Sequence, residues 1–258
     1  MATHNALMQD LIHFDTLKVW SVLVTIFGDL APGPNDTVRG PELSALTSRM
    51  AIKPEALRVA IHRLRNDGWI ASEKSGRVSY YRLSTVGRSE TETARERVYG
   101  SPLSINADWH AVLTERDLDE ATSQGWLLVR EGFYLVNHRP LPQKGDFVTQ
   151  ITDTTLPDWI INAICAPAIQ AKYFEFIAIL KRVQDAPVPG CPLDRVALRL
   201  LVLHAWRRLV LRNDLYMLGD LAPAWFSEQA LAVVQATLGS LRGDTLAVSD
   251  PEERMSAQ

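Results

Sequence analysis

Apolar residues at helical spacing mark the region of the chain on which most of the prediction rests. Over residues 54–66 the side chains of Leu57, Ile61 and Leu64 recur about one turn apart, which predicts one inward stripe of an α-helix. Gly68 follows, and glycine is the residue that most often adopts the left-handed conformation after a helix end. We therefore predict a helix over this range, with its other side chains facing outward.

A two-stranded ribbon is predicted directly after this helix. Residues 69–75 and 78–83 contain β-branched and aromatic side chains, and Gly76 stands between them, as in a hairpin. Upstream, residues 17–30 form a strongly amphipathic helical pattern and residues 39–48 a shorter one. The order helix, helix, turn, helix, ribbon predicts a winged helix-turn-helix, a module that reads DNA.

After residue 100 the apolar pattern changes to short strands. The expected strands are residues 109–113, 126–130, 133–137 and 147–151, with helices over 115–123 and 156–163. The order strand, helix, strand, strand, helix suggests a small ferredoxin-like α+β unit. Helical patterns then return over residues 173–183, 193–212 and 225–241.

These patterns predict an α+β, multi-domain protein with four consecutive segments. We expect a winged-helix DNA-binding domain with leading and trailing helices over residues 1–99, the trailing one being an exposed helix over residues 85–99 that leads away from the DNA module. A ferredoxin-like dimerisation or effector domain is expected over residues 100–165, and a C-terminal helical domain over residues 166–242. Residues 243–258 are expected to form a disordered tail.

The composition is that of a soluble globular protein, since 47% of the 258 residues are hydrophobic and 22% are charged. No apolar run is long enough to span a bilayer, and the N-terminus lacks the pattern of a signal peptide. We therefore expect a cytoplasmic protein without a membrane partner. Two cysteines, Cys165 and Cys191, are too few for a disulfide framework or a zinc knuckle, and we expect neither a metal site nor a bound cofactor.

Positive charge is concentrated in the predicted helix and ribbon, although the whole chain has a net charge of -3. Between Arg49 and Arg82, both included, eight basic residues stand against three acidic ones. A local excess of this kind is the expected footprint of a phosphate backbone, whereas scattered charge marks an ordinary solvated surface. The residues that we expect to contact DNA are Arg58, His62, Arg63, Arg65, Lys74, Arg77, Ser79 and Tyr81.

Two kinds of DNA contact are open to these residues. Arg58, His62 and Arg63 of the predicted helix are placed to reach either base edges or phosphates. Lys74 and Arg77 of the ribbon are expected to hold phosphate or to enter the minor groove. The helix itself is expected to lie in the major groove.

A series of short motifs in a fixed order resembles a known family. The segment RVAIHRL at residues 58–64 precedes Gly68-Trp69 and Gly76-Arg77, and the later segments are ARERVY at 94–99 and HAWRR at 204–208. This ordered series runs through almost the whole folded chain. It is similar to that of PaaX-type repressors, which control phenylacetate catabolism.

The resemblance implies a homodimeric transcriptional repressor with three parts. These would be an N-terminal winged helix, a central domain similar to the Cas2-like ferredoxin fold, and a C-terminal helical domain. The implied partners are a palindromic double-stranded operator of an aromatic-compound catabolic operon and a small aromatic or aryl-CoA effector. Binding of the effector would release the protein from the operator.

Aromatic rings and cations after residue 100 are the candidates for an effector site. A pocket for an acidic or CoA-bearing ligand would use rings for the apolar body and guanidinium groups for the charge. The alternative is that the tryptophans fill cores, that the arginines cover surfaces, and that His204 is a hydrogen-bonded core histidine. The candidate residues are Trp109, Trp126, Arg130, Tyr134, His204, Trp206 and Arg207.

Catalytic motifs are missing from the sequence. It contains neither a GxSxG elbow, a P-loop, a GxGxxG turn after a strand nor an HExxH pair. Asp108 and Asp117 near the first central strand are single acids, which are more often caps or loop residues. We expect no enzyme and no catalytic residue. The alternative is a cytoplasmic acyl-CoA-binding or hydrolytic enzyme that carries a winged-helix fold.

Overall fold

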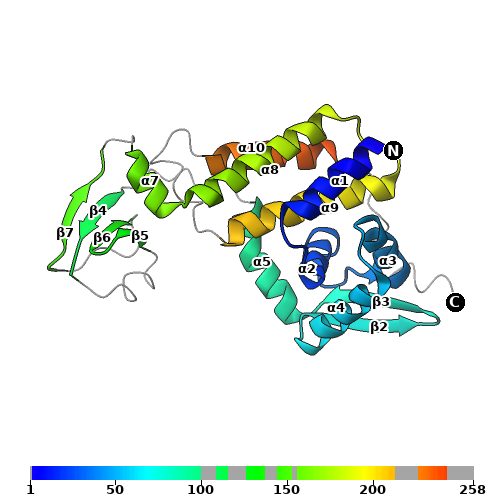
Figure 1. Cartoon of the computed structure of the whole chain (residues 1–258). Coiled ribbons are helices and arrows are strands. Elements are labelled where there is room, and N and C mark those ends of the chain that lie inside the picture. Colours follow the sequence, from blue (N-terminus) through cyan, green and yellow to red (C-terminus); the bar gives the residue numbers. More distant parts are fainter. Residues whose placement is uncertain are drawn as a thin grey trace. The chain divides into compact units, whose positions relative to one another are not determined.

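Helices and two small antiparallel sheets make up the described part of the chain in this computed structural model (Figure 1). The structure describes residues 2–99, 109–115, 126–136, 144–152, 156–212 and 226–242. The chain divides into two compact units. Unit 1 is Met1–Tyr99, Phe176–Arg212 and Ala232–Gln258, and unit 2 is Gly100–Glu175 and Asn213–Leu231. The predicted mixture of helix and sheet is confirmed.

The first 99 residues of unit 1 contain five helices, a short strand and a hairpin. In chain order these are α1 (Ala2–Phe14), α2 (Val19–Leu30), β1 (Val38–Arg39), α3 (Gly40–Arg49), α4 (Pro54–Asn66), β2 (Ile70–Ser75), β3 (Val78–Leu83) and α5 (Thr85–Tyr99). The predicted helix and ribbon are confirmed as α4 and the β2–β3 hairpin. Strand β1 was not predicted: Val38 pairs with Tyr81 and Arg39 with Tyr80, so β3 is the central strand of a β1-β3-β2 sheet.

Hydrogen bonds at the end of α4 join this helix to the hairpin and to α5. Gly68 has a φ of 71°, and the amides of Gly68 and Trp69 donate to the carbonyl oxygens of Arg65 (3.1 Å) and Leu64 (2.8 Å), which is the Schellman pattern. Ser84, just before α5, donates its hydroxyl to the Gly68 carbonyl at 2.5 Å. Its amide donates to the Trp69 carbonyl at 2.9 Å. One junction therefore sets the directions of helix, hairpin and α5.

Helix α5 packs within unit 1 against α2 and α9 (Pro192–Arg212). Val98 near its end is buried, and its carbonyl accepts a 2.9 Å hydrogen bond from Trp206 Nε1. At its start, a Cβ atom on Gly87 would collide with the Trp69 carbonyl oxygen, so only glycine fits there. The helix expected over residues 85–99 is confirmed and most of its described residues are exposed, but one side of it is packed within unit 1.

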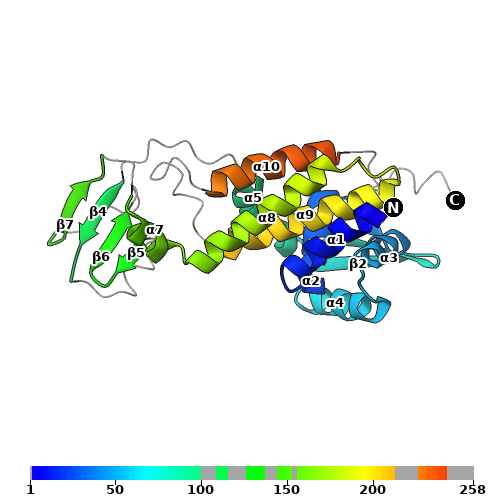
Figure 2. The ribbon, with the colours of Figure 1, turned by 45° about the horizontal axis from the view of Figure 1, so that its top comes forward.

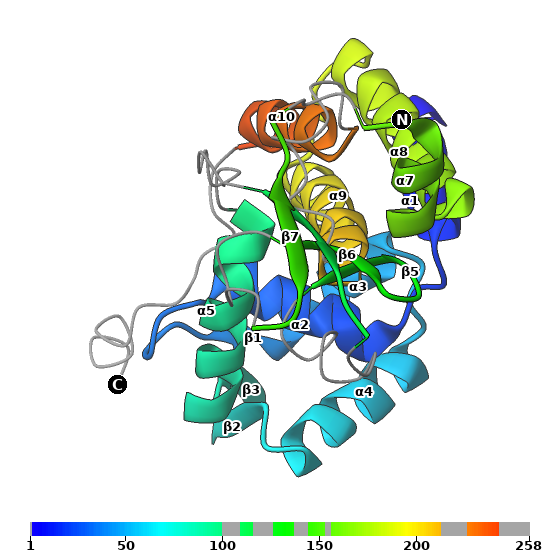
Figure 3. The same cartoon turned by 90° about the vertical axis from the view of Figure 1, so that its left-hand side faces the viewer.

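The C-terminal helices are α8 (Pro167–Asp185), α9 and α10 (Phe226–Ser240). Helix α9 is buried along most of its length because α1, α2, α3 and α5 all contact it, and Figure 2 shows it beside α1. The helical segment expected as a separate domain is therefore grouped differently, since its residues Phe176–Arg212 belong to unit 1. Figure 3 shows α4 and the hairpin together at the lower edge of this unit, below α2.

Ion pairs tie α9 to the N-terminal helices. Arg199 donates from Nη2 to Oδ1 of Asp29 at 2.7 Å and from Nε to Oδ2 at 3.0 Å, and its Nη1 donates to the Leu238 carbonyl at 2.9 Å. Farther along the helix, Arg208 Nε lies 2.7 Å from Oδ2 of Asp15. Both pairs are largely buried. Removing one partner of such a pair would leave a buried charge uncompensated, which is strongly destabilising.

Unit 2 contains the second sheet. Its described elements are β4 (His110–Leu113), β5 (Leu127–Arg130), β6 (Phe133–Val136), β7 (Phe147–Gln150) and α7 (Asp158–Ile164). The strands are antiparallel in the order β5-β6-β4-β7, and α7 packs beside β5. The four strands and the helix predicted near residue 160 are confirmed. The predicted helix at 115–123 and the tail at 243–258 lie outside the described residues, except Glu115.

Candidate nucleic-acid interface

Helix α4 turns one face to the core of unit 1 and the opposite face to solvent. Leu57 and Leu64 are buried, as their spacing predicts. At 3.6 residues per turn, Glu55, Val59 and His62 lie on the opposite side of the helix. All three are exposed, and Val59 is 69% exposed. The outermost line of α4 is therefore a mixed ridge of one carboxylate, one apolar side chain and one imidazole.

The arginines of α4 lie on the two flanks of this ridge. Arg58 and Arg65 share one flank, and Arg63 lies on the other. The Arg63 guanidinium carbon is 5.2 Å from the centre of the Trp20 ring on α2, and its Nε is 3.4 Å from Oδ2 of Asp67. A cation over an indole face is attracted to it. Arg63 is thus held towards α2, whereas the other two arginines extend into solvent.

Exposed pairs on α4 leave its charges available to a ligand. Arg58 Nη2 lies 3.4 Å from Oε1 of Glu55, and both side chains are more than 70% exposed. Pairs of this kind contribute little to stability, with a median of about 0–1 kcal/mol. His62 Nδ1 lies 3.3 Å from Asn66 Nδ2, also at the surface. An incoming phosphate can replace such partners at small cost.

The β2–β3 hairpin carries further cations beside the ones on α4. Lys74 lies opposite Ser79 in the antiparallel register, so the two side chains share one face of the hairpin. Lys74 and Arg77 are exposed, whereas Ser79 and Tyr81 are partly buried. Arg82 Nη1 is 3.6 Å from Oε2 of Glu73. The hairpin therefore presents two exposed cations near its tip, whereas Ser79 and Tyr81 farther along its second strand are partly buried.

The predicted DNA-contacting residues are thus brought together on α4 and the hairpin that follows it. The junction at Gly68 connects the two elements directly. Their exposed cations outnumber the nearby acids, and those acids are exposed too. Chemically, this surface is suited to a polyanion and has a helix that fits a DNA major groove. Among the described residues, no group of three or more His, Cys, Asp or Glu could hold a metal ion.

Val59 was not singled out from the sequence as a candidate contact. From the sequence alone, an apolar residue in a basic helix is interpreted first as a core residue. Its offset from Leu57 and Leu64 places it about half a turn from the buried stripe, and this offset is the signal that would have found it. The partnership of Arg63 with Trp20 has no such signal, because the two residues lie on different helices.

The predicted effector residues fall into two groups, one in each unit. Trp109, Trp126 and Tyr134 are buried in unit 2, and the rings of the last two lie 5.6 Å apart. The Arg130 guanidinium carbon lies 5.6 Å from the Trp159 ring centre. His204 and Trp206 are buried in unit 1, and Arg207 is half-buried beside them. Core packing therefore accounts for the three tryptophans of this set and for Tyr134.

His204 is a hydrogen-bonded core histidine. Its Nδ1 lies 3.2 Å from Thr25 Oγ1, and the Thr25 hydroxyl donates to the Ser21 carbonyl at 3.1 Å. Because the hydroxyl proton is used in that bond, the Thr25 oxygen is left to accept from Nδ1–H. We assign the tautomer protonated at Nδ1 on this ground. Nε2 is buried and has no protein partner among the described residues.

Acid is expected to destabilise the protein through His204. Burial, together with the positive charges of Arg208 and Arg207, lowers the pKa of His204 from 6.5 to about 3, and Asp15 opposes this shift. Between these two pKa values the unfolded chain binds a proton that the folded chain excludes. Stability therefore falls as the pH drops from about 6.5 towards about 3, at up to ~1.4 kcal/mol per pH unit from this residue.

Urea unfolding across this pH range tests the expectation. His204→Gln should show a shallower loss of stability than the wild-type protein, because glutamine does not titrate. His13→Gln, at an exposed position of α1, serves as the matched control and should retain the wild-type slope. Equal slopes for His204→Gln and wild type would contradict this assignment.

Among the described residues, no single helix is long and apolar enough to cross a membrane. Two bent pairs of helices meet the requirements of length and apolar composition when each pair is taken together. The pairs are His4–Phe14 with Val19–Leu30 and Asp158–Ile164 with Pro167–Asp185.

Comparisons with known proteins find resemblances to this chain. Residues 18–87 match the family model described as PaaX-like protein. The transcriptional repressor PaaX of Escherichia coli strain K12 is 23% identical over 226 residues, which cover 76% of this chain and 71% of that protein. The uncharacterized protein Rv0674 from Mycobacterium tuberculosis is a solved structure with 17% identity and a TM-score of 0.43, over 86% of this chain and 94% of its own.

The exposed cationic surface of α4 and the β2–β3 hairpin lies within the residues that match the family model. The resemblance to the PaaX family is confirmed, and the chain carries a PaaX-like region over residues 18–87.

Proposed function

We propose that this chain is a cytoplasmic, DNA-binding transcriptional repressor of an aromatic-compound catabolic operon. The observation that carries the proposal is the exposed cationic surface of α4 and the β2–β3 hairpin, which lies entirely within the residues that match the PaaX-like family model. The relative from Escherichia coli is itself a transcriptional repressor. No enzymatic activity is part of this proposal.

In the proposed complex, residues 17–84 act as a winged helix. Helix α4 enters the major groove and the hairpin lies along the backbone as the wing. Val59 and His62, on the outermost ridge of α4, reach base edges, and an apolar side chain suits the methyl group of thymine. The remaining proposed contacts are Arg58, Arg63, Arg65, Lys74, Arg77, Ser79 and Tyr81. Arg63 approaches the DNA from the α2 side, with Trp20 holding its guanidinium.

The proposed repressor is a homodimer on a palindromic operator, with unit 2 as the dimerisation unit. The strand order β7-β4-β6-β5 is that of a ferredoxin-like sheet, although α7 follows β7 here. Strand β7 is an edge strand with all four residues exposed, including Phe147 at 64%. Apolar edges of this kind favour pairing with another chain. Sedimentation equilibrium of the full chain tests for a dimer.

A salt titration of DNA binding tests the proposed function. The probe is a duplex selected by the full-length protein from a random library. The logarithm of the binding constant should fall steeply and linearly with the logarithm of salt concentration, because bound cations displace counterions from phosphates. Lys74→Ala should reduce this slope by about one unit, since it removes one phosphate contact.

The matched control is Lys181→Ala, which removes an exposed lysine of α8 outside the interface. Its slope should equal that of the wild-type protein. Failure to select any duplex at low salt, or a flat salt dependence, would overturn the repressor proposal. Equal slopes for Lys74→Ala and wild type would remove the hairpin from the DNA interface.

A further inference from the structure

The side chains of α4 are sorted by charge around the helix. Arg58 and Arg65 lie on one flank and Arg63 lies on the other. The ridge between the flanks has no lysine or arginine, and it consists of Glu55, Val59 and His62. In a DNA major groove, phosphates line the two walls and base edges form the floor. The flanks of α4 are therefore suited to the phosphates of the two strands, and the ridge is suited to the bases.

Val59 is suited to an apolar group on a base. It is 69% exposed, more than any other large hydrophobic side chain in the described part of the chain. An exposed valine gains little from burial, and a β-branched side chain forms helix less readily than alanine. It also gains nothing from a phosphate. The apolar group that a major groove offers is the C5 methyl group of thymine.

Glu55 needs a hydrogen-bond donor once DNA is bound. Its Oε1 lies 3.4 Å from Arg58 Nη2, and both side chains are more than 70% exposed. A phosphate attracts Arg58 away from this pair and repels the carboxylate. A carboxylate that loses water and its cation without finding a new donor is costly. On the floor of the major groove, the donors are the exocyclic amines of cytosine and adenine.

Cytosine is the better partner of the two bases. Adenine presents its N7 acceptor beside its amine, and N7 would repel the second oxygen of the carboxylate. Cytosine presents its N4 amine without a neighbouring acceptor. Guanine and thymine offer only acceptors in the major groove, so they would leave Glu55 without a donor. The carboxylate therefore favours cytosine and rejects guanine and thymine.

We propose that Glu55 and Val59 are specificity-determining residues that read one cytosine and one thymine of the operator. The two residues are four positions apart, which is about 6 Å along the axis of α4. Neighbouring bases of one strand are about 3.4 Å apart along the DNA axis. With α4 along the groove, the two bases lie about two base pairs apart. This inference rests on the proposed DNA-binding function.

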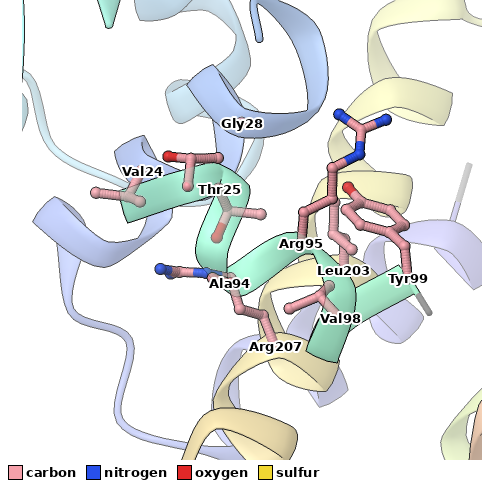
Figure 4. A pocket seen from close by; sticks show the side chains of 10 residues that line it. Val24, Thr25, Gly28, Ala94, Arg95, Val98, Tyr99, Leu203 and Arg207 are labelled. Carbon is pink, nitrogen blue, oxygen red and sulfur yellow. The ribbon is translucent and has the colours of Figure 1, made fainter. Parts of the chain in front are cut away.

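Tight packing behind α4 supports such a readout. Helix α4 packs against α2, which in turn contacts α5 and α9. Between these last three helices lies a small hollow, with Val24 and Thr25 of α2, Val98 of α5 and Arg207 of α9 among its lining residues (Figure 4). Its volume is about 30 Å³, the space of about one or two water molecules. Direct contacts with bases need a rigid support of this kind.

Exchange of single thymines for deoxyuridine tests the role of Val59, because the exchange removes only the methyl group. The probe is the duplex selected by the full-length protein, and mobility shift at one fixed salt concentration measures binding. At one thymine, the exchange should weaken binding by the wild-type protein about fourfold, the effect expected for one buried methyl group. Val59→Ala should bind the thymine duplex more weakly by a similar factor and should not distinguish the two duplexes.

Val188→Ala is the matched control, because Val188 is 48% exposed and lies before α9, outside the candidate interface. It should distinguish thymine from deoxyuridine as the wild-type protein does. Without DNA, Val59→Ala should melt at or above the wild-type temperature, because alanine is the better helix former. A clearly lower melting temperature would assign Val59 to the fold and overturn its role in readout.

Exchange of single C·G pairs for T·A pairs tests the role of Glu55. For one pair, about two base pairs from the sensitive thymine, the exchange should weaken binding by the wild-type protein about fivefold or more. Glu55→Gln should reduce this discrimination to about twofold or less, because glutamine has both a donor and an acceptor. The ratio is taken within one variant, so the loss of a favourable charge in the first helical turn does not enter it.

Glu92→Gln, at an exposed position of α5, is the matched control and should keep the wild-type discrimination. A selected duplex that tolerates the loss of every thymine methyl group, or a Val59→Ala protein that still senses it, would overturn the role of Val59. Unchanged discrimination by Glu55→Gln would overturn the role of Glu55. The proposed DNA-binding function would stand in each of these cases. A protein that selects no duplex would overturn that function, and this inference with it.

Discussion

Replacing Arg58, Lys74 and Arg77 together by alanine is expected to weaken operator binding by about a thousandfold or more. All three side chains are exposed, and in the proposed complex each makes a charge-assisted contact worth roughly 1.5–3 kcal/mol. At the lower value the three contacts amount to about 4.5 kcal/mol, and each ~1.4 kcal/mol is a tenfold change in the dissociation constant. Electrophoretic mobility shift at one fixed salt concentration measures the loss.

A second triple variant controls for loss of net charge. Lys172→Ala, Lys181→Ala and Arg242→Ala together remove the same charge from exposed positions outside the interface, and this variant should retain most of the affinity. Both triple variants should melt close to the wild-type protein, because exposed substitutions usually change stability by about 0.5 kcal/mol or less each. Equal losses of operator affinity in the two variants would show that the net charge of the whole protein, and not the α4 and hairpin surface, drives binding.

Trp206→Ala is expected to lower the free energy of unfolding by about 3–5 kcal/mol, the range for large aromatic residues in cores. The ring is fully buried and lies nearly parallel to that of Phe176, with 6.4 Å between the centres. Its Nε1 donates to the Val98 carbonyl at 2.9 Å. The substitution removes the packing of α9 against α8 and the bond to α5 at the same time. Urea unfolding followed by circular dichroism measures the change.

Two further variants separate these contributions. Trp206→Phe keeps an aromatic ring but leaves the Val98 carbonyl without its donor, and we expect a loss of about 1–3 kcal/mol. Trp159→Ala removes a tryptophan that is 50% exposed, and the expected loss is about 1 kcal/mol or less. A Trp206→Ala protein as stable as the wild type would contradict the structural role and would reopen this residue as a ligand contact.

Helix α4 and the hairpin were predicted well because their determinants are local. The spacing of Leu57 and Leu64, the glycine after the helix, and the glycine at the hairpin tip each act over a few residues. Strand β1 was not predicted because two residues carry no periodicity of their own. Val38 and Arg39 are a strand only because Tyr80 and Tyr81 pair with them. A local sequence pattern does not reveal long-range strand pairing of this kind.

The candidate interface was predicted in outline but not in detail. Charge along the sequence was sufficient to select the α4 and hairpin segment, because a polyanion-binding surface is mainly an excess of exposed cations. The role of each cation depends on its neighbours in space. Arg63 lies over a ring that is 43 positions away in the sequence, whereas Arg58 pairs with Glu55 of its own helix turn. The sequence treats these two arginines alike.

By itself, the sequence determined the α+β composition, the position of the basic segment and the order of most elements, because hydrophobic spacing, turn residues and local charge act over short distances. The tertiary structure decided which charged side chains have an ion-pair partner. Arg207 and Arg208 are neighbours in the sequence, yet Arg208 meets Asp15 and Arg207 faces a hollow. The difference arises because successive residues of a helix point about 100° apart and meet different neighbouring helices.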